Sequence, residues 1–336
     1  MNSDEKYMMR AIELAKLGEG LTRPNPPVGA VLVLEDYIVA EGWHQKAGAD
    51  HAERDCIGKL PPIATSLKFA TLYVTLEPCS THGRTPPCTD LILEKGIGRV
   101  VVSVADFNPA HAGRGLKILK DAGVEVVSGV CEAEGRELIA PFEKFITTGL
   151  PYVTLKLAST LDGKIADSQG DSKWITGAEA REKVQEMRRR SDAIMVGAGT
   201  VRADNPSLLP RPSNDRKPWR IIIGSDVPED SKVRNDDAAD RTLVRSGDLK
   251  TILTELAEKQ DIMHVFCEGG GQLAAGLIDG GLVDEFAFFI APKLMGADGL
   301  PNFGKTGGLI ADLTQLKFQS LEQVGNDLYI KAKMEK

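Results

Sequence analysis

The sequence predicts an α/β fold divided into two domains, and three observations support this prediction. Strand-length runs rich in Val, Leu and Thr alternate with amphipathic stretches, several of which end at glycine. The chain of 336 residues is long enough to bury two separate cores. Its longest apolar runs, such as residues 28–34, are far shorter than the roughly 20 residues of a membrane span.

The first domain is expected to span residues 1–148. An amphipathic helix opens the chain. Strands are expected at residues 28–34, 70–76, 99–104 and 124–129, and helices at 51–60, 89–96 and 115–123. A further helix beginning near Gly135 ends in Thr-Thr-Gly before Pro151, which places the domain boundary there.

The second domain, residues 149–336, repeats the alternation of strands and helices. Its clearest helix is expected at residues 178–190, and residues 215–219 and 227–240 are expected to be surface loops. Strands are expected within residues 152–159, 192–197, 219–225, 241–246, 263–271, 284–292 and 327–334.

The charge and composition of the chain disfavour nucleic acids and membranes as its partners. The net charge is −7, and no basic run is longer than residues 188–190, which disfavours a nucleic-acid duplex but leaves room for a local phosphate site. The N-terminus has no apolar segment followed by a cleavage site, so we expect no secretory signal, no membrane partner and a cytoplasmic location. The five cysteines then need no disulfide.

Two cysteines in residues 76–88, LEPCSTHGRTPPC, raise three alternatives: a disulfide loop, a metal clamp or an ordinary turn. His51 lies 28 positions before Cys79, and with Cys88 it would give zinc three protein ligands. Three ligands leave one tetrahedral position for water, as in catalytic rather than structural zinc sites. Glu53, two positions after the histidine, is the candidate proton carrier, and Cys79 is expected at a helix N-terminus, where a thiolate is favoured.

Three segments of the first domain resemble the deaminase half of the bifunctional riboflavin biosynthesis deaminase–reductase family. They are residues 22–33 (TRPNPPVGAVLV), 42–53 (GWHQKAGADHAE) and 77–88 (EPCSTHGRTPPC), and the insertion GRTPP between the cysteines is typical of that family. The order H-x-E then P-C also matches zinc deaminases in general, although those have two residues, not eight, between the cysteines. The chain departs from the family in HAERDCI at residues 51–57 and in Thr81, and neither change affects the metal ligands.

The resemblance implies a cytidine-deaminase-like domain, a three-layer α/β/α structure with a mixed sheet. It implies zinc on His51, Cys79 and Cys88, with Glu53 as the proton shuttle. It also implies that Asn25 and His44 lie in the region that holds the pyrimidine, although Asn25 between prolines is equally typical of a turn.

Two glycine-rich turns follow strands of the second domain. Gly197-Ala198-Gly199 fails as a dinucleotide-binding fingerprint because Arg202 stands at the third glycine position. Residues 269–271 are three glycines between a strand and a helix, where backbone N–H groups can face a phosphate, or where the chain simply turns tightly.

Together with residues 155–167 (LKLASTLDGKIAD) and 172–177 (SKWITG), these turns resemble the reductase half of the same family. The resemblance covers residues 3–333 and implies a dihydrofolate-reductase-like α/β domain that uses NADPH. By motif, the NADPH contacts are Ala158, Trp174, Thr200, Asp204, Ser225, Gly270, Gly271, Gln272, Leu273, Ala274, Ala275 and Gly276. The substrate contacts are Ser172, Arg188, Leu208, Arg211 and Glu268, and the two arginines suit a 5′-phosphate.

The resemblance therefore implies zinc-dependent deamination of 2,5-diamino-6-(5-phosphoribosylamino)pyrimidin-4(3H)-one, followed by NADPH reduction of the ribosyl chain of 5-amino-6-(5-phosphoribosylamino)uracil. It also implies a homo-oligomer, a dimer or a tetramer. Two alternatives remain: a deaminase acting on a nucleoside or RNA, and a zinc-stabilised module that only binds a nucleotide. The first would favour a C-x-x-C pair and, for RNA, a basic or aromatic surface, whereas aromatic residues make up only 5% of the chain.

Overall fold

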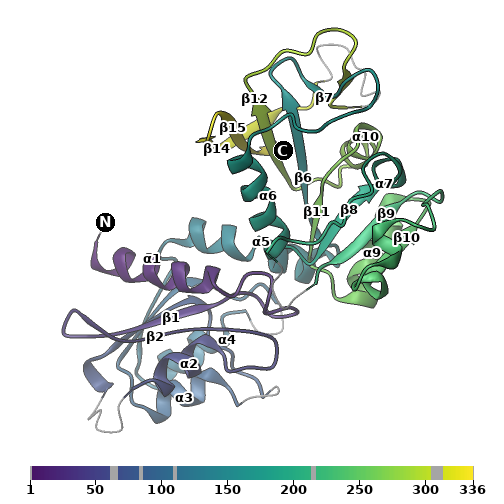
Figure 1. Cartoon of the computed structure of the whole chain (residues 1–336). Helices are drawn as coiled ribbons and strands as arrows, with labels where there is room; N and C mark the ends of the chain where they lie inside the picture. Colours follow the sequence, from purple (N-terminus) through teal and green to yellow (C-terminus); the bar gives the residue numbers. More distant parts are fainter. Residues whose placement is uncertain are drawn as a thin grey trace. The chain divides into compact units, whose positions relative to one another are not determined.

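Two β-sheets, one in each half of the chain, organise the computed structural model (Figure 1). The structure describes residues 2–60, 67–82, 86–108, 112–212, 217–303 and 313–335. The chain divides into two units, Met1–Gly149 and Leu150–Lys336. Gly149 has a φ of +70° and ends the last helix of the first unit.

The first unit contains a mixed five-stranded sheet in the order β2-β1-β3-β4-β5. β1 pairs antiparallel with β2 and β3, whereas β3, β4 and β5 run parallel. The strands are β1 Gly29–Leu34, β2 Tyr37–Trp43, β3 Thr71–Leu76, β4 Arg99–Val104 and β5 Glu125–Ser128.

Helices cover both faces of this sheet, as the predicted three-layer class requires. On one face α1 and α5 pack against a core that includes Val31 and Val101; on the other, α2, α3 and α4 pack against Val100 and Val102. Successive valines of β4 point to opposite faces of the sheet, so this one strand contributes side chains to both cores. The helices are α1 Ser3–Lys16, α2 Ala52–Gly58, α3 Cys88–Glu94, α4 Arg114–Asp121 and α5 Glu132–Thr148, and a short 3₁₀ helix, η1 Leu67–Phe69, precedes β3.

Glu77 fastens the end of β3 to the start of α4. Its buried carboxylate accepts hydrogen bonds from the N–H groups of Asp106, Gly113, Gly115 and Leu116 at 2.8 to 3.3 Å. The negative charge therefore lies at the positive end of the α4 dipole. A Cβ on Gly115 would lie 2.3 Å from the Pro78 carbonyl oxygen, so glycine permits this close approach.

The second unit contains an eight-stranded sheet in the order β10-β9-β8-β11-β6-β12-β15-β14. The six strands from β10 to β12 run parallel, and β15 and β14 add an antiparallel end. The strands are β6 Tyr152–Thr160, β8 Ala193–Gly197, β9 Trp219–Ile223, β10 Thr242–Arg245, β11 His264–Cys267, β12 Glu285–Ala291, β14 Leu316–Val324 and β15 Asp327–Met334; a separate pair joins β7 Lys164–Ala166 to β13 Leu300–Pro301.

Helices α9 and α10 contribute to one core of this unit, and α6 and α7 contribute to the other. The helices are α6 Ala178–Arg190, α7 Ala198–Asp204, α8 Lys232–Asn235, α9 Leu249–Gln260 and α10 Gly271–Asp279, with the 3₁₀ helix η2 Ala239–Arg241. None of the described helices has the length and apolar character needed to cross a membrane.

The segment 227–240, expected to be a surface loop, contains α8 and encloses a buried charge. Arg220 on β9 has no exposed surface, and its guanidinium binds both carboxylate oxygens of Asp236 at 2.6 and 2.7 Å. The same group donates to the carbonyl oxygens of Ser207 and Val233 at 3.0 Å. Arg220 therefore joins three separate segments near the start of β9.

We predict that Arg220→Met lowers the free energy of unfolding by about 3 kcal/mol, because it leaves Asp236 and two carbonyl groups without their buried partner. The matched control is Lys217→Met, which removes the exposed Lys217–Asp237 pair of the same region and should cost less than about 1 kcal/mol. Urea denaturation followed by tryptophan fluorescence measures both. Equal losses in the two variants would contradict the role given to Arg220.

Candidate metal centre and cofactor cavity

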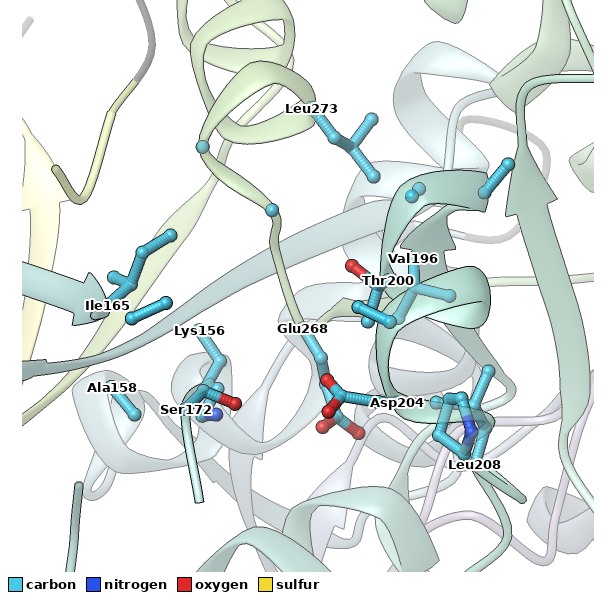
Figure 2. A pocket seen from close by; sticks show the side chains of 18 of the residues that line it. Lys156, Ala158, Ile165, Ser172, Val196, Thr200, Asp204, Leu208, Glu268 and Leu273 are labelled. Atoms are coloured by element: carbon cyan, nitrogen blue, oxygen red, sulfur yellow. The ribbon is translucent and has the colours of Figure 1, made fainter. Parts of the chain in front are cut away.

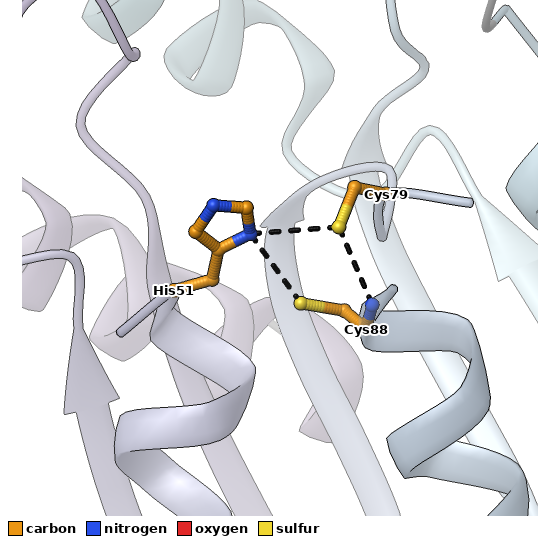
Figure 3. A group of neighbouring side chains, drawn as sticks. All are labelled: His51, Cys79 and Cys88. Carbon is orange, nitrogen blue, oxygen red and sulfur yellow. Dashed lines mark hydrogen bonds between the residues drawn. The ribbon is translucent and has the colours of Figure 1, made fainter. Parts of the chain in front are cut away.

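Three side chains that can bind a metal converge in the first unit (Figure 3). The Nδ1 atom of His51 lies 3.5 Å from the sulfur of Cys79 and 3.5 Å from the sulfur of Cys88. The three ligand atoms all lie within 4.8 Å of one another. Among the described residues, no other group of three or more His, Cys, Asp or Glu side chains is close enough to hold a metal.

Each ligand sits at the end of a regular element. His51 is the extended residue immediately before α2, Cys79 follows β3, and Cys88 is the first residue of α3. The sequence placed a helix N-terminus at Cys79; the helix instead begins at Cys88, and the Cys88 N–H donates to the Cys79 sulfur at 3.3 Å. Part of the insertion between the cysteines, residues 83–85, lies outside the described residues.

Hydrogen bonding favours a thiolate at Cys79. Donation from the Cys88 thiol, and then from His51 and the Cys88 N–H, lowers the pKa of Cys79 to about 4 against the opposing effect of burial. The same donation, together with burial, raises the pKa of the Cys88 thiol. One imidazole nitrogen and two sulfurs are a donor set that suits zinc. Cys56, Cys131 and Cys267 take no part in it.

Glu53 lies in the first turn of α2 and is only 3% exposed. Burial, and then the nearby Cys79 charge, raises the pKa of this carboxyl to about 7. A carboxyl group with a pKa near neutrality can both accept and release a proton in one catalytic cycle.

Asn25 and His44, the two expected pyrimidine contacts, bind each other. The Asn25 side-chain nitrogen lies 3.1 Å from His44 Nε2, and His44 Nδ1 lies 2.9 Å from the Asp50 carbonyl oxygen. His44 is 2% exposed and its ring meets the His51 ring edge-on at 5.5 Å. The buried histidine thus supports Asn25, which is the more exposed of the two.

The second unit contains a cavity of about 1330 Å³ at the carboxyl ends of the parallel strands (Figure 2). Fourteen of the residues expected to bind cofactor or substrate line it. They are Ala158, Ser172, Trp174, Arg188, Thr200, Asp204, Leu208, Arg211, Ser225, Glu268, Gly270, Gly271, Gln272 and Leu273.

Ala274, Ala275 and Gly276, the other three residues of the expected cofactor segment 270–276, do not line this cavity. They lie further along α10, and Ala274 is fully buried in the core of the sheet. Within this segment, only Gly270 and the first three residues of α10 line the cavity. Gly270 has a φ of +98°, and a Cβ there would lie 3.4 Å from Thr200 Oγ1, so this turn approaches α7 closely.

A buried ion pair occupies one end of the cavity. Arg188 Nη2 lies 2.8 Å from Glu268 Oε2, and Arg188 Nε binds the other carboxylate oxygen. Burial alone would raise the pKa of Glu268, but the charge and hydrogen bonds of Arg188 outweigh it and lower the pKa.

Lys156, which no sequence motif indicated, also lines this end of the cavity (Figure 2). Burial lowers the pKa of its ammonium group against the opposing effect of Glu268. The available signal was a single lysine within an apolar strand, since Lys156 interrupts the β6 run YVTLKLAST.

Two family models match the chain. The cytidine and deoxycytidylate deaminase zinc-binding region matches residues 1–104, and the RibD C-terminal domain matches residues 151–330. The two matches fall in the two units that the fold defines.

Relatives match over nearly the whole chain. The riboflavin biosynthesis protein RibD of Bacillus amyloliquefaciens is 42% identical over 98% of this chain and 96% of its own length. RibD of Escherichia coli (strain K12) is 41% identical over 97% of this chain and 98% of its own length.

Solved structures agree with these matches. A diaminohydroxyphosphoribosylaminopyrimidine deaminase/5-amino-6-(5-phosphoribosylamino)uracil reductase from Thermotoga maritima has a TM-score of 0.92 at 39% identity, over 99% of both chains. Acinetobacter baumannii RibD has a TM-score of 0.90 at 36% identity, over 99% of both chains. The chain belongs to the RibD family of riboflavin biosynthesis proteins, bifunctional enzymes in which a deaminase region precedes a reductase domain.

Proposed function

We propose that the chain deaminates 2,5-diamino-6-(5-phosphoribosylamino)pyrimidin-4(3H)-one at a zinc site. It then reduces the ribosyl chain of 5-amino-6-(5-phosphoribosylamino)uracil with NADPH. The observation that carries this proposal is the convergence of His51, Cys79 and Cys88 beside the buried Glu53, in a chain whose second unit holds the expected cavity. The activities printed for the Thermotoga maritima relative support the same pair of reactions.

In the deaminase site, His51, Cys79 and Cys88 would hold the metal through Nδ1 and two sulfurs. Zinc there would act as a Lewis acid that activates a water for attack on the amino-bearing carbon of the pyrimidine. Glu53 takes the proton of that water and passes it to the ring nitrogen. It then takes the proton of the newly added hydroxyl group, which becomes the carbonyl, and delivers it to the departing ammonia. Its raised pKa, about 7, suits this exchange. Asn25, held by His44, contacts the pyrimidine.

In the reductase site, the glycine turn before α10, with Thr200 opposite, accommodates the cofactor phosphates. NADPH would supply the hydride for reduction of the ribosyl chain. The fork of Arg188 is already engaged by Glu268, so this pair shapes the substrate end of the cavity. Arg211, exposed at the rim, is the better candidate to bind the 5′-phosphate.

We also propose that the chain assembles with copies of itself and works in the cytoplasm. The chain forms a homo-oligomer. Phe318 and Leu321 support this, because each is an apolar side chain 58% exposed on the edge strand β14, where a second copy could cover it. It works in the cytoplasm, which the five free cysteines support.

The two alternatives from the sequence are disfavoured by the same observations. A nucleoside or RNA deaminase would not need the reductase domain that matches residues 151–330. A zinc-stabilised binding module would not need a buried carboxylate beside a three-ligand metal site.

We predict that Glu53→Gln lowers the deamination rate at least about 100-fold, because the amide cannot carry the proton. Zinc content and NADPH oxidation with the deaminated substrate should be unchanged. Ammonia release, bound-metal analysis and absorbance at 340 nm measure the three quantities. The control is Glu94→Gln, an exposed carboxyl on α3. Deamination by Glu53→Gln at the parent rate would remove Glu53 from the mechanism.

We also predict that Arg188→Lys raises the KM for the reductase substrate about tenfold or more, because lysine keeps the charge but loses the planar fork that binds Glu268. Arg190→Lys, which alters an exposed pair with Glu186 on the same helix, is the matched control and should behave like the parent. Steady-state reduction of the deaminated pyrimidine measures the effect. Equal kinetics in both variants would show that the buried pair does not shape the substrate end.

A further inference from the structure

The cavity in the second unit has two chemically different ends. Lys156, Arg188 and Glu268 form the end at β6 and β11. The other end lies at β9 and β10, where Ser225, Gly247 and Leu249 line the cavity. The sheet order β10-β9-β8-β11-β6 places the glycine turn after β8 between these ends, and the glycine turn after β11 borders the first end.

This order fixes the direction of a bound dinucleotide. The nicotinamide must contact the reducible substrate, so it lies at the end that contains Lys156 and Glu268. With its phosphates at the glycine turns, the adenosine must extend toward β9 and β10. Its ribose therefore reaches the turn Gly224-Ser225-Asp226 that follows β9.

Arg202 stands at that turn. It comes from α7, lines the cavity, and its Nη1 donates to the Asp226 carbonyl oxygen at 2.6 Å. The same nitrogen lies 3.2 Å from the Asp226 carboxylate, and both side chains are exposed, at 46% and 83%. An ideal Cβ at Gly199 would lie 3.8 Å from Arg202 Nη2, so the guanidinium extends over the start of α7.

An exposed ion pair of this kind contributes little stability, so a stronger anion can replace its carboxylate. A dianionic phosphate that accepts two parallel N–H bonds from a guanidinium is such an anion. Dinucleotide sites that select NAD place an acidic side chain against the ribose 2′-hydroxyl, whereas an arginine accommodates the 2′-phosphate of NADP. Gly224, the first residue after β9, has no carboxylate, and the carboxylate of Asp226, two positions later, is the one that Arg202 binds.

We propose that Arg202, together with the Ser225 hydroxyl, binds the 2′-phosphate of the adenosine ribose and thereby selects NADPH over NADH. In the bound state the phosphate takes the place of the Asp226 carboxylate on the guanidinium. This assignment rests on the proposed use of a dinucleotide in the cavity. It gives a function to the residue that breaks the glycine fingerprint of the sequence.

The test compares two probes that differ only by the 2′-phosphate, adenosine 2′,5′-bisphosphate and 5′-AMP, by isothermal titration calorimetry with the full chain. Arg202→Ala should weaken binding of the bisphosphate about 10- to 100-fold, the range for loss of a charge-assisted hydrogen bond. Binding of 5′-AMP should change by less than about twofold, since the lost contact is specific to the 2′-phosphate. Arg202→Lys should fall between the parent and Arg202→Ala. Arg234→Ala, an exposed cation on α8 outside the cavity lining, should affect neither probe.

A second variant tests the exchange of anions. Asp226→Asn removes the carboxylate that competes for Arg202 and should tighten binding of the bisphosphate severalfold without changing that of 5′-AMP. If Asp226→Asn instead abolishes binding of the bisphosphate, the Asp226 carboxylate holds Arg202 in place rather than competing with the phosphate, and the proposed exchange of anions is wrong.

The remaining outcomes separate this inference from the proposed function. Equal loss of both probes in Arg202→Ala, or no loss of either, overturns the role of Arg202. In that case NADP⁺ binding by the parent chain would still support a cofactor site in the cavity. If the parent chain binds neither NADP⁺ nor NAD⁺, the proposed reductase site itself fails.

Discussion

The deaminase unit depends on bringing one nitrogen and two sulfurs from separate parts of the chain to a single point. The three atoms lie within 4.8 Å of one another because the ligands stand where α2 begins, where β3 has ended and where α3 begins. Glu77 stabilises this arrangement, because its carboxylate binds the loop after β4 and the start of α4 to the end of β3. The same α2 turn that follows His51 buries Glu53 beside the sulfurs.

In the reductase unit, residues from separate strands come together at the carboxyl ends of the parallel strands, which meet at one edge of the sheet. β6, β8, β9 and β11 each end at the cavity and contribute Ala158, the turn before Thr200, Ser225 and Glu268 respectively. Charge divides this single space. A buried pair of Arg188 and Glu268 occupies one end, whereas an exposed pair of Arg202 and Asp226 lies at the other.

The sequence predicted the fold class and most strands of both units, because apolar runs such as RVVVSV signal a buried strand directly. It missed β14, whose residues are nearly all exposed and show no apolar alternation, and the burial of Arg220, which depends on a partner 16 residues away. It also could not show that Arg188 is bound by Glu268, 80 residues further along the chain. Motif resemblance supplied the cavity residues, but the helical turn of α10 that removes Ala274 from the cavity is visible only in three dimensions.

The most direct test of the account is X-ray absorption spectroscopy at the zinc edge, combined with metal analysis, on the purified full chain. We predict one zinc per chain, bound by two sulfurs, one imidazole nitrogen and one light atom from water. A zinc shell of four protein ligands would contradict this prediction. So would a Cys79→Ser, Cys88→Ser double variant that still binds zinc and keeps part of the sulfur signal.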